Sequence, residues 1–164
     1  MKIHYGSTIN ITNEKAHQIT ATDSEKDVKM TLIEEASNSS KWKILAKNSD
    51  GTTISEKNRE EVKYGDLVGF QNIENNNWLS ARGKESAISV PVCREWEVFK
   101  IDIGGGNGKP IPEKGSMQII SEPFQRNEPS TPFLSWQYAT GGELVNCIDN
   151  GHNHGTHWGL TTNL

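Results

Sequence analysis

The chain has 164 residues, a length that fits one domain with a sizeable buried core. Its formal net charge is −4, with 17 Lys and Arg against 21 Asp and Glu, so it lacks the basic character typical of nucleic-acid-binding proteins. No apolar run approaches the ~20 residues of a membrane-spanning helix, and five Trp and four Phe supply too much apolar mass for a disordered chain.

Short segments in which apolar and polar residues alternate recur along the chain. This period-two pattern, rich in Ile, Val and Thr, predicts strands, and the Asn-, Gly- and Pro-rich stretches between them predict turns. The expected strands are STINIT (7–12), VKMTLI (28–33), DLVGF (66–70), AISVPV (87–92), EVFKI (97–101) and SMQII (116–120). Such regularly spaced short strands indicate an all-β barrel or sandwich.

Helical signals are poor. Residues 55–66 (SEKNREEVKYGD) are the one window that combines a cap-like Ser with charged helix-forming residues. The window has no apolar stripe, so we expect a solvated turn with at most one helical turn. The glycine-rich stretch 104–110 (GGGNGKP) lacks the frame of a phosphate-binding loop and is interpreted as a connection between repeats.

Two long segments, starting at Tyr5 and Tyr64, share one frame. Each begins with Tyr-Gly and a strand, continues through a turn to an apolar-then-small stretch (QITAT, NWLSA), and closes on Trp-x-apolar. A looser third copy runs from KGSMQII through PFLSW to HWGL. One such unit cannot bury its own apolar face, but three can close a barrel without free sheet edges.

The Trp residues follow from this frame. Trp42, Trp96 and Trp158 close the three copies, so we expect all three in the core. Trp78 is aligned with Ile19 and Phe133 and is also expected to be mostly core.

The repeat pattern resembles the β-trefoil superfamily over nearly the whole chain. The segment YGDLVGFQN…NNWLSAR…WEVFKI is most similar to units of the fascin and MIR branches. The resemblance implies a single all-β domain, a β-trefoil with pseudo-threefold symmetry and three four-stranded lobes at about 1–50, 51–103 and 104–164. The ricin-type lectin branch has Gln-x-Trp at the closing strand, whereas Ser40, Arg94 and Thr156 stand there in this chain, so ricin-type sugar-binding residues are not carried over.

The third copy contains aromatic residues that the repeat does not explain. Trp136 and Tyr138, in LSWQYATGG, are two residues apart and would share one face of a strand. They precede the polar stretch CIDNGHNHGTHW (147–158). A sugar stacks its C–H face on an aromatic ring while carboxylate and amide groups bind its hydroxyls. We therefore predict a carbohydrate site at Trp136, Tyr138, Asp149, Asn150, His152 and Asn153. The alternative is that Trp136 only fills the larger third lobe.

A second predicted contact region lies in NIENNNWLSARGKE (72–85). Asn76 and Arg82 offer an amide and a guanidinium on an expected hairpin. The alternative interpretation is a tight hairpin in which Asn adopts the left-handed conformation.

No cofactor or metal is predicted. The histidines of residues 152–157 are interpreted as a plain or ligand-contacting loop rather than a metal centre. Cys93 and Cys147 are expected to be two reduced thiols, with a disulfide between them as the alternative. No nucleophile elbow or catalytic triad pattern is present in the sequence, so we expect a non-enzymatic protein.

The predicted function is recognition of a glycan or glycoprotein by a lectin-like domain. Two alternatives remain open: a fascin- or MIR-like module that binds a protein partner, such as a cytoskeletal protein, and a protease-inhibitor-like trefoil that uses the proline-containing loop at 121–132. The first residues resemble no secretory signal, so we expect a cytoplasmic protein or one released without a classical signal peptide.

Overall fold

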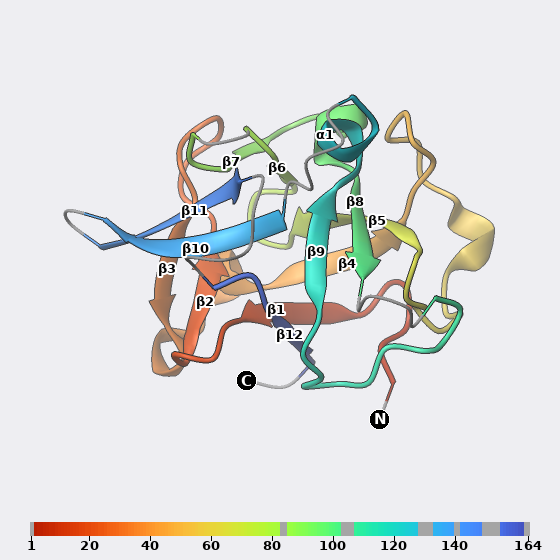
Figure 1. The fold of residues 1–164 in the computed structure, drawn as a ribbon, viewed down its shortest axis with the longest axis horizontal. Coiled ribbons are helices and arrows are strands. Elements are labelled where there is room, and N and C mark those ends of the chain that lie inside the picture. Colours follow the sequence, from red (N-terminus) through yellow and green to blue (C-terminus); the bar gives the residue numbers. More distant parts are fainter. Residues whose placement is uncertain are drawn as a thin grey trace.

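A computed structural model describes residues 2–82, 85–102, 107–127, 133–139, 142–148 and 155–162. In these ranges the chain forms twelve strands, four short 3₁₀-helices and one short α-helix (Figure 1). The strands are β1 (Thr8–Thr12), β2 (His17–Thr20), β3 (Lys29–Leu32), β4 (Trp42–Ala46), β5 (Leu67–Asn72), β6 (Trp78–Ser80), β7 (Ile88–Val90), β8 (Phe99–Asp102), β9 (Gln118–Ser121), β10 (Phe133–Ala139), β11 (Gly142–Ile148) and β12 (Gly159–Thr161). The helices are η1 (Ile33–Glu35), η2 (Asn38–Ser40), η3 (Ser55–Lys57), η4 (Glu95–Glu97) and α1 (Glu122–Asn127).

Six strands form an antiparallel barrel. Their order is β1, β4, β5, β8 and β9, and β12 pairs with β1. The Met117 N–H donates to the Trp158 oxygen at 2.9 Å and closes the ring between the β9 and β12 segments. The remaining strands form the hairpins β2–β3, β6–β7 and β10–β11. This arrangement of three four-stranded units confirms the all-β, β-trefoil expectation.

Backbone hydrogen bonds show the pseudo-threefold symmetry directly. The Ile3 N–H donates to Ile111 O at 3.1 Å, Ile111 N–H to Val62 O at 2.9 Å, and Val62 N–H to Ile3 O at 2.8 Å. The three residues are fully buried and come from the beginnings of the three units. A closed cycle of three bonds requires that the three segments meet around one axis.

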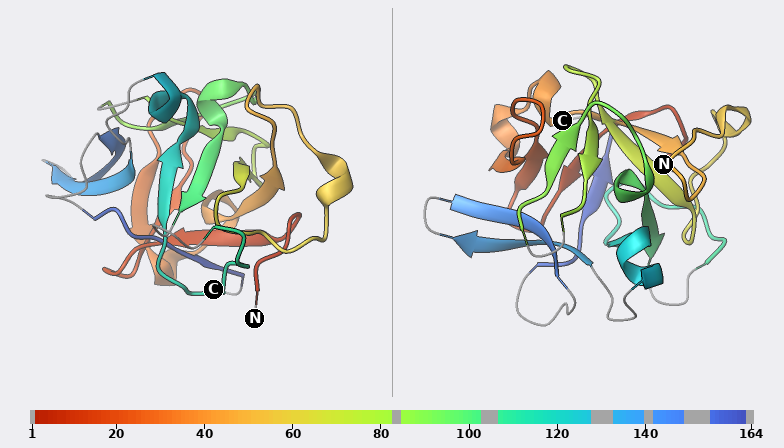
Figure 2. Two further views of the ribbon diagram at one scale, coloured as in Figure 1. Left: turned by 45° about the vertical axis from the view of Figure 1, so that its right-hand side comes forward. Right: turned by 90° about the horizontal axis from the view of Figure 1, so that it is seen from above.

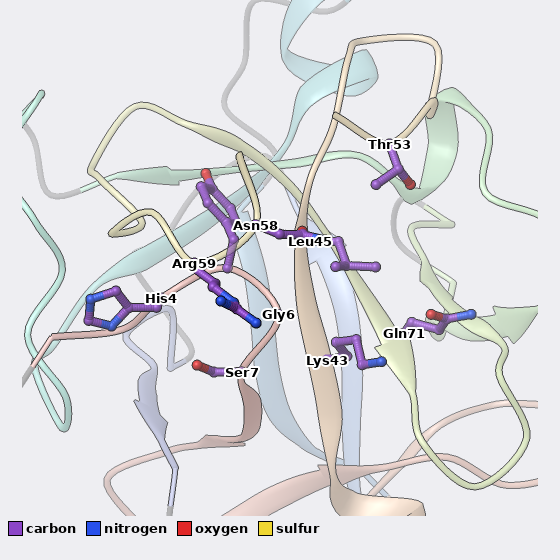
Figure 3. Close-up of a pocket in the computed structure, with 10 residues that line it drawn as sticks. His4, Gly6, Ser7, Lys43, Leu45, Thr53, Asn58, Arg59 and Gln71 are labelled. Carbon is purple, nitrogen blue, oxygen red and sulfur yellow. The ribbon is translucent and has the colours of Figure 1, made fainter. Parts of the chain in front are cut away.

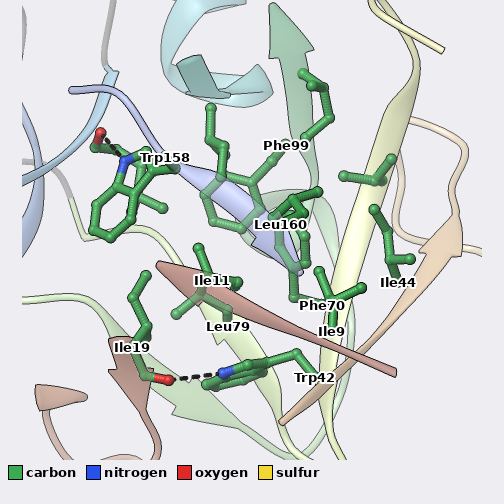
Figure 4. Packing of buried hydrophobic residues seen from close by; sticks show 14 of the residues in the cluster. Ile9, Ile11, Ile19, Trp42, Ile44, Phe70, Leu79, Phe99, Trp158 and Leu160 are labelled. Carbon is green, nitrogen blue, oxygen red and sulfur yellow. Dashed lines mark hydrogen bonds between the residues drawn. The ribbon is translucent and has the colours of Figure 1, made fainter. Parts of the chain in front are cut away.

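Aromatic side chains fill equivalent places in the barrel (Figure 4). Trp42, Phe99 and Trp158 each begin or precede the last strand of a unit, and each is at most 1% exposed. The indole N–H of Trp42 donates to Ile19 O at 3.0 Å, and that of Trp158 to Leu134 O at 2.8 Å. Both bonds fix a closing strand to the hairpin of its own unit.

Trp96 departs from the expectation that it lies in the core. Its side chain is 38% exposed, because it lies in η4, three residues before Phe99, which occupies the barrel position. The alignment of Trp78 with Phe133 is confirmed, since Trp78 pairs with Gln71 on the neighbouring barrel strand as Phe133 pairs with Ile120. In the first unit the alignment shifts by one residue, because Gln18 and not Ile19 pairs with Thr12. Trp78 is buried, as expected.

Other sequence expectations are resolved by the same structure. The turn at 55–66 contains the short helix η3, as expected. The stretch at 121–132 is predicted to be a loop, but the structure has the helix α1 at residues 122–127, directly after β9. Cys93 and Cys147 are free thiols. In the part of the chain that the structure describes, no helix is long and apolar enough to cross a membrane.

Candidate functional site

A cavity of about 420 Å³ opens in the second unit, where the β6–β7 hairpin meets η4 and α1. Its volume falls within the range typical of small-molecule sites. Figures 1 and 2 show α1 beside the η4 segment, and η4 in turn contacts β6. The cavity is lined by Ser80, Ala81, Arg82, Glu85, Val90, Trp96, Glu97 and Phe124.

Two aromatic rings form one wall of this cavity. Trp96 comes from η4, and Phe124 comes from α1 of the following unit. Their centroids are 4.9 Å apart and their planes make an angle of 56°. Trp96 is among the large apolar residues that remain exposed, so part of its ring is available to a ligand.

A carboxylate also lines the cavity. Glu97 is 5% exposed, and the Ser80 hydroxyl donates to its Oε2 at 2.6 Å. The Arg94 backbone N–H donates to its Oε1 at 2.8 Å and thereby caps η4. Both carboxylate oxygens are therefore held in place, which fixes the orientation of η4 and of Trp96 on it.

Charged groups dock α1 against η4. The Arg126 guanidinium lies 3.2 Å from Glu95 Oε2 and 3.5 Å from Glu122 Oε2. The Glu122 backbone N–H donates to Val98 O at 3.1 Å. Exposed ion pairs contribute little stability, so the backbone bond and the Trp96–Phe124 contact are the main links between the two elements.

A buried lysine holds the turn at residues 51–53, which lies against the Cys93–Arg94 backbone that leads into η4. The Lys47 ammonium donates to Gly51 O at 3.1 Å and to Thr53 Oγ1 at 2.6 Å, and lies 3.7 Å from the Trp78 ring centroid. Burial lowers the pKa of Lys47. Burial also raises the pKa of the Cys93 thiol to about 11, against the opposing effect of the nearby Lys47, so this thiol is protonated at neutral pH.

The pseudo-threefold symmetry explains why the exposed ring lies in the second unit. The Ala81 N–H donates to Trp96 O, and the equivalent bond in the third unit runs from Trp136 N–H to Gly155 O. The large and small residues are thus exchanged between the two units. In the third unit, a Cβ atom added at Gly155 would lie 1.8 Å from the Trp136 ring, so that indole fills the space beside the glycine. In the second unit, the small Ala81 leaves the space open.

The sequence-predicted residues fall in different places. Arg82 is exposed and lines the cavity, whereas Asn76 lies at the tip of the β5–β6 turn with φ 62° and does not line it. Trp136 is 5% exposed and belongs to the core, so the packing role left open by the sequence is the one observed for its ring. Tyr138 lies in β10, and nothing is described of its side chain. Asp149, Asn150, His152 and Asn153 lie outside the described residues.

Sequence reasoning missed the two aromatic residues of the cavity. Trp96 was assigned to the core because EWEVFKI matches the Trp-x-apolar pattern. Phe124 lies 28 positions further along the chain in a stretch interpreted as a loop. No helix-start signal in the sequence separates Trp96 from the strand that follows, because Arg94 is not a capping residue type and η4 is a single turn.

Metal ligands do not converge among the described residues, where no group of three His, Cys, Asp or Glu side chains could hold an ion. Burial raises the pKa of Cys147 to about 12, so this thiol is also protonated at neutral pH.

Comparison with known proteins supports the fold. No family model matches the chain, and no curated protein matches it in sequence. Among solved structures, the SDF2-like protein from Arabidopsis thaliana superposes with a TM-score of 0.70 at 18% identity, over 98% of this chain and 95% of that one.

Two further structures share the architecture. SeviL, solved with the asialo-GM1 saccharide, gives a TM-score of 0.60 at 10% identity over 96% of this chain and 98% of its own. The designed threefold-symmetric protein ThreeFoil gives 0.63 at 10% identity over 96% and 99%. At these identities the likeness establishes the β-trefoil fold alone.

Proposed function

We propose that the protein is a non-enzymatic recognition module that binds a glycan in the cavity between η4 and α1, hereafter the aromatic pocket. The observation that carries this proposal is the exposed Trp96 ring, which packs at an angle against Phe124 in a cavity that a fixed carboxylate also lines. A sugar presents an apolar C–H face and a ring of hydroxyls, and an aromatic wall beside polar groups complements both.

Four of the lining residues have a role in this mode of binding. The Trp96 ring stacks on the C–H face of the sugar. The guanidinium of Arg82 donates hydrogen bonds to sugar hydroxyls, and the carboxylate of Glu85 accepts them. Glu97 acts indirectly, since its two oxygens already hold Ser80 and the start of η4.

The fold is compatible with this role, because SeviL shares it and was solved with a saccharide bound. The third-unit residues Tyr138, Asp149, Asn150, His152 and Asn153 remain a proposed second contact region. Either region could be used alone, and the variants below separate them.

The test is a glycan array followed by titration of the best ligand. We expect Trp96→Ala to weaken binding at least about tenfold, which corresponds to ~1.4 kcal/mol. Leu32→Ala is the matched control, because Leu32 is another exposed large apolar residue, at 44%, and does not line the pocket. Circular dichroism and thermal melting verify that both variants fold.

Two results would contradict the proposal. A folded wild type with no glycan bound would exclude glycan recognition, and a protein partner would then be sought. Binding that survives Trp96→Ala but is lost in Asp149→Ala would move the site to the third unit.

A further inference from the structure

A second cavity, of about 750 Å³, lies where the first two units meet along the side of the barrel (Figure 3). It shares no lining residue with the aromatic pocket. Strands β4 and β5 form part of it, together with the segment before β1 and the one after η3. We call it the interlobe groove.

The lining of the interlobe groove is cationic in a chain of net charge −4. Lys43 and Arg59 are exposed and line it together with His4, and no carboxylate is among the described lining residues. Within the described part of the chain, neither Lys43 nor Arg59 is held in an ion pair. Burial and two nearby acids, Asp66 and Glu60, raise the pKa of Tyr5, but neither acid lines the groove. Asp66 Oδ2 accepts from the Tyr5 hydroxyl at 2.6 Å and from Lys63 N–H at 3.0 Å.

Local structure fixes where the two cations project. Lys43 lies on β4 between the buried Trp42 and Ile44, so strand alternation directs its side chain out of the barrel. Its cross-strand partner on β5 is Gln71, which also lines the groove. Figure 3 shows the Lys43 and Gln71 side chains close together at one side of the groove and Arg59 reaching toward Gly6.

The opposite side of the groove is formed by two backbone segments tied together. Arg59 has φ 77°, and its N–H donates to Tyr5 O at 3.0 Å. Gly6 has φ 90°, and an added Cβ there would meet nothing within 4 Å, so the groove is open at this point. Ser7 and Asn58 add a hydroxyl and an amide to the lining.

This surface differs in kind from the aromatic pocket. Its one phenol ring, Tyr5, is 3% exposed, and the hydroxyl of Tyr5 is already bonded to Asp66. A neutral sugar would therefore find only the imidazole of His4 to stack on. Charge is the main property that this groove offers to a ligand.

We propose that the interlobe groove binds an oxyanion carried on a hydroxylated ligand, namely a sulfated or phosphorylated saccharide. The planar guanidinium of Arg59 matches the paired oxygens of a sulfate or phosphate ester, and Lys43 adds a second charge. Ser7, Asn58 and Gln71 hydrogen-bond the hydroxyls of the same ligand. The proposal is independent of the aromatic pocket.

Titration calorimetry with four small probes tests the proposal. The probes are a sulfated disaccharide, its unsulfated parent, glucose 6-phosphate and glucose. We expect at least one charged sugar to bind, its neutral counterpart to bind at least about tenfold more weakly, and affinity to fall as salt is raised from 50 to 500 mM. Whichever anion binds more tightly identifies the source of the oxyanion.

Three variants locate the binding. Lys43→Gln and Arg59→Gln each remove one lining charge from an exposed side chain, and each should weaken binding about tenfold. Lys100→Gln is the matched control. Lys100 lies on β8 and pairs with Leu67, just as Lys43 lies on β4 and pairs with Thr8. Lys100 does not line the groove. Its affinity should equal that of the wild type.

Several outcomes would overturn the proposal. These are no binding of either charged sugar, equal affinity for charged and neutral sugars, or an equal loss in Lys100→Gln, which would indicate diffuse attraction to any lysine. Trp96→Ala should leave groove binding unchanged. Loss of charged-sugar binding in that variant would assign the ligand to the aromatic pocket instead, so the two proposals fail separately.

Discussion

At the scale of single residues, the three barrel aromatics show how one position tolerates different side chains. The indole N–H groups of Trp42 and Trp158 donate to carbonyl oxygens of the hairpin in the same unit, those of Ile19 and Leu134. Phe99 fills the equivalent place in the second unit with no N–H to donate, and it is 0% exposed. A buried aromatic ring at this position is therefore common to all three units, whereas the hydrogen bond from the ring is not.

Trp158→Phe separates these two contributions. We expect the free energy of unfolding to fall by about 1–3 kcal/mol, since the Leu134 oxygen loses its donor and a small cavity forms. Urea denaturation monitored by circular dichroism measures the change. Trp96→Phe is the control, because Trp96 is 38% exposed and its replacement should change stability by less than about 0.5 kcal/mol. Equal losses in both variants would contradict the structural role of Trp158.

At the scale of elements, two turns with positive φ serve different purposes. Gly6 has φ 90° with open space where a Cβ would lie, and Lys114 adopts φ 63° at the equivalent point of the third unit. The Gly6 N–H donates to Ile44 O and the Lys114 N–H donates to Leu160 O, and these two acceptors lie at matching positions of the closing strands. Gly51 differs, because an added Cβ would lie 2.6 Å from Arg94 Cα and from Cys93 O. Glycine is required there by close approach as well as by φ.

A pair of alanine substitutions measures that close approach. Gly6→Ala should cost about 1–2 kcal/mol of stability, the price of a left-handed alanine alone. Gly51→Ala adds the clash with the Cys93–Arg94 backbone, and we expect it to cost about 1–3 kcal/mol more. Thermal and urea unfolding provide both values. A Gly51→Ala variant as stable as Gly6→Ala would show that the segment before η4 moves freely.

How far the sequence predicted these elements depends on which interactions define them. Period-two alternation identified six of the twelve strands that the structure describes. It did so because burial on one face is written locally, as in residues 97–101, where Phe99 and Ile101 are buried and Lys100 between them is half-buried. The Trp-x-apolar pattern misplaced Trp96, because Phe99 takes the position of Trp42 in the second unit and Trp96 lies three residues earlier in η4, as Ser39 lies in η2. The aromatic pocket also needs Phe124 from the next unit, and a contact between distant segments leaves no periodic signal in either of them.

At the scale of the whole molecule, closure couples the two ends of the chain. Strand β12 pairs with β1, and the cycle of Ile3, Val62 and Ile111 links the starts of all three units. Each cavity lies between two units, since the interlobe groove spans the first and second units and the aromatic pocket spans the second and third, so neither exists in an isolated unit. Non-local pairing of this kind is typical of slowly folding β proteins.

Amide hydrogen exchange tests whether the three units act as one cooperative structure. Ile3 lies near the start of the chain, where amides commonly exchange through local fraying. Because its N–H closes the cycle by donating to Ile111, we expect it to exchange as slowly as Val62 and Ile111, through global unfolding. The exposed Asn76 turn, whose N–H bonds only to Asn72 O, provides the fast reference. Fast exchange at Ile3 with slow exchange at Val62 and Ile111 would contradict a closed cycle and would indicate that the first unit opens independently of the other two.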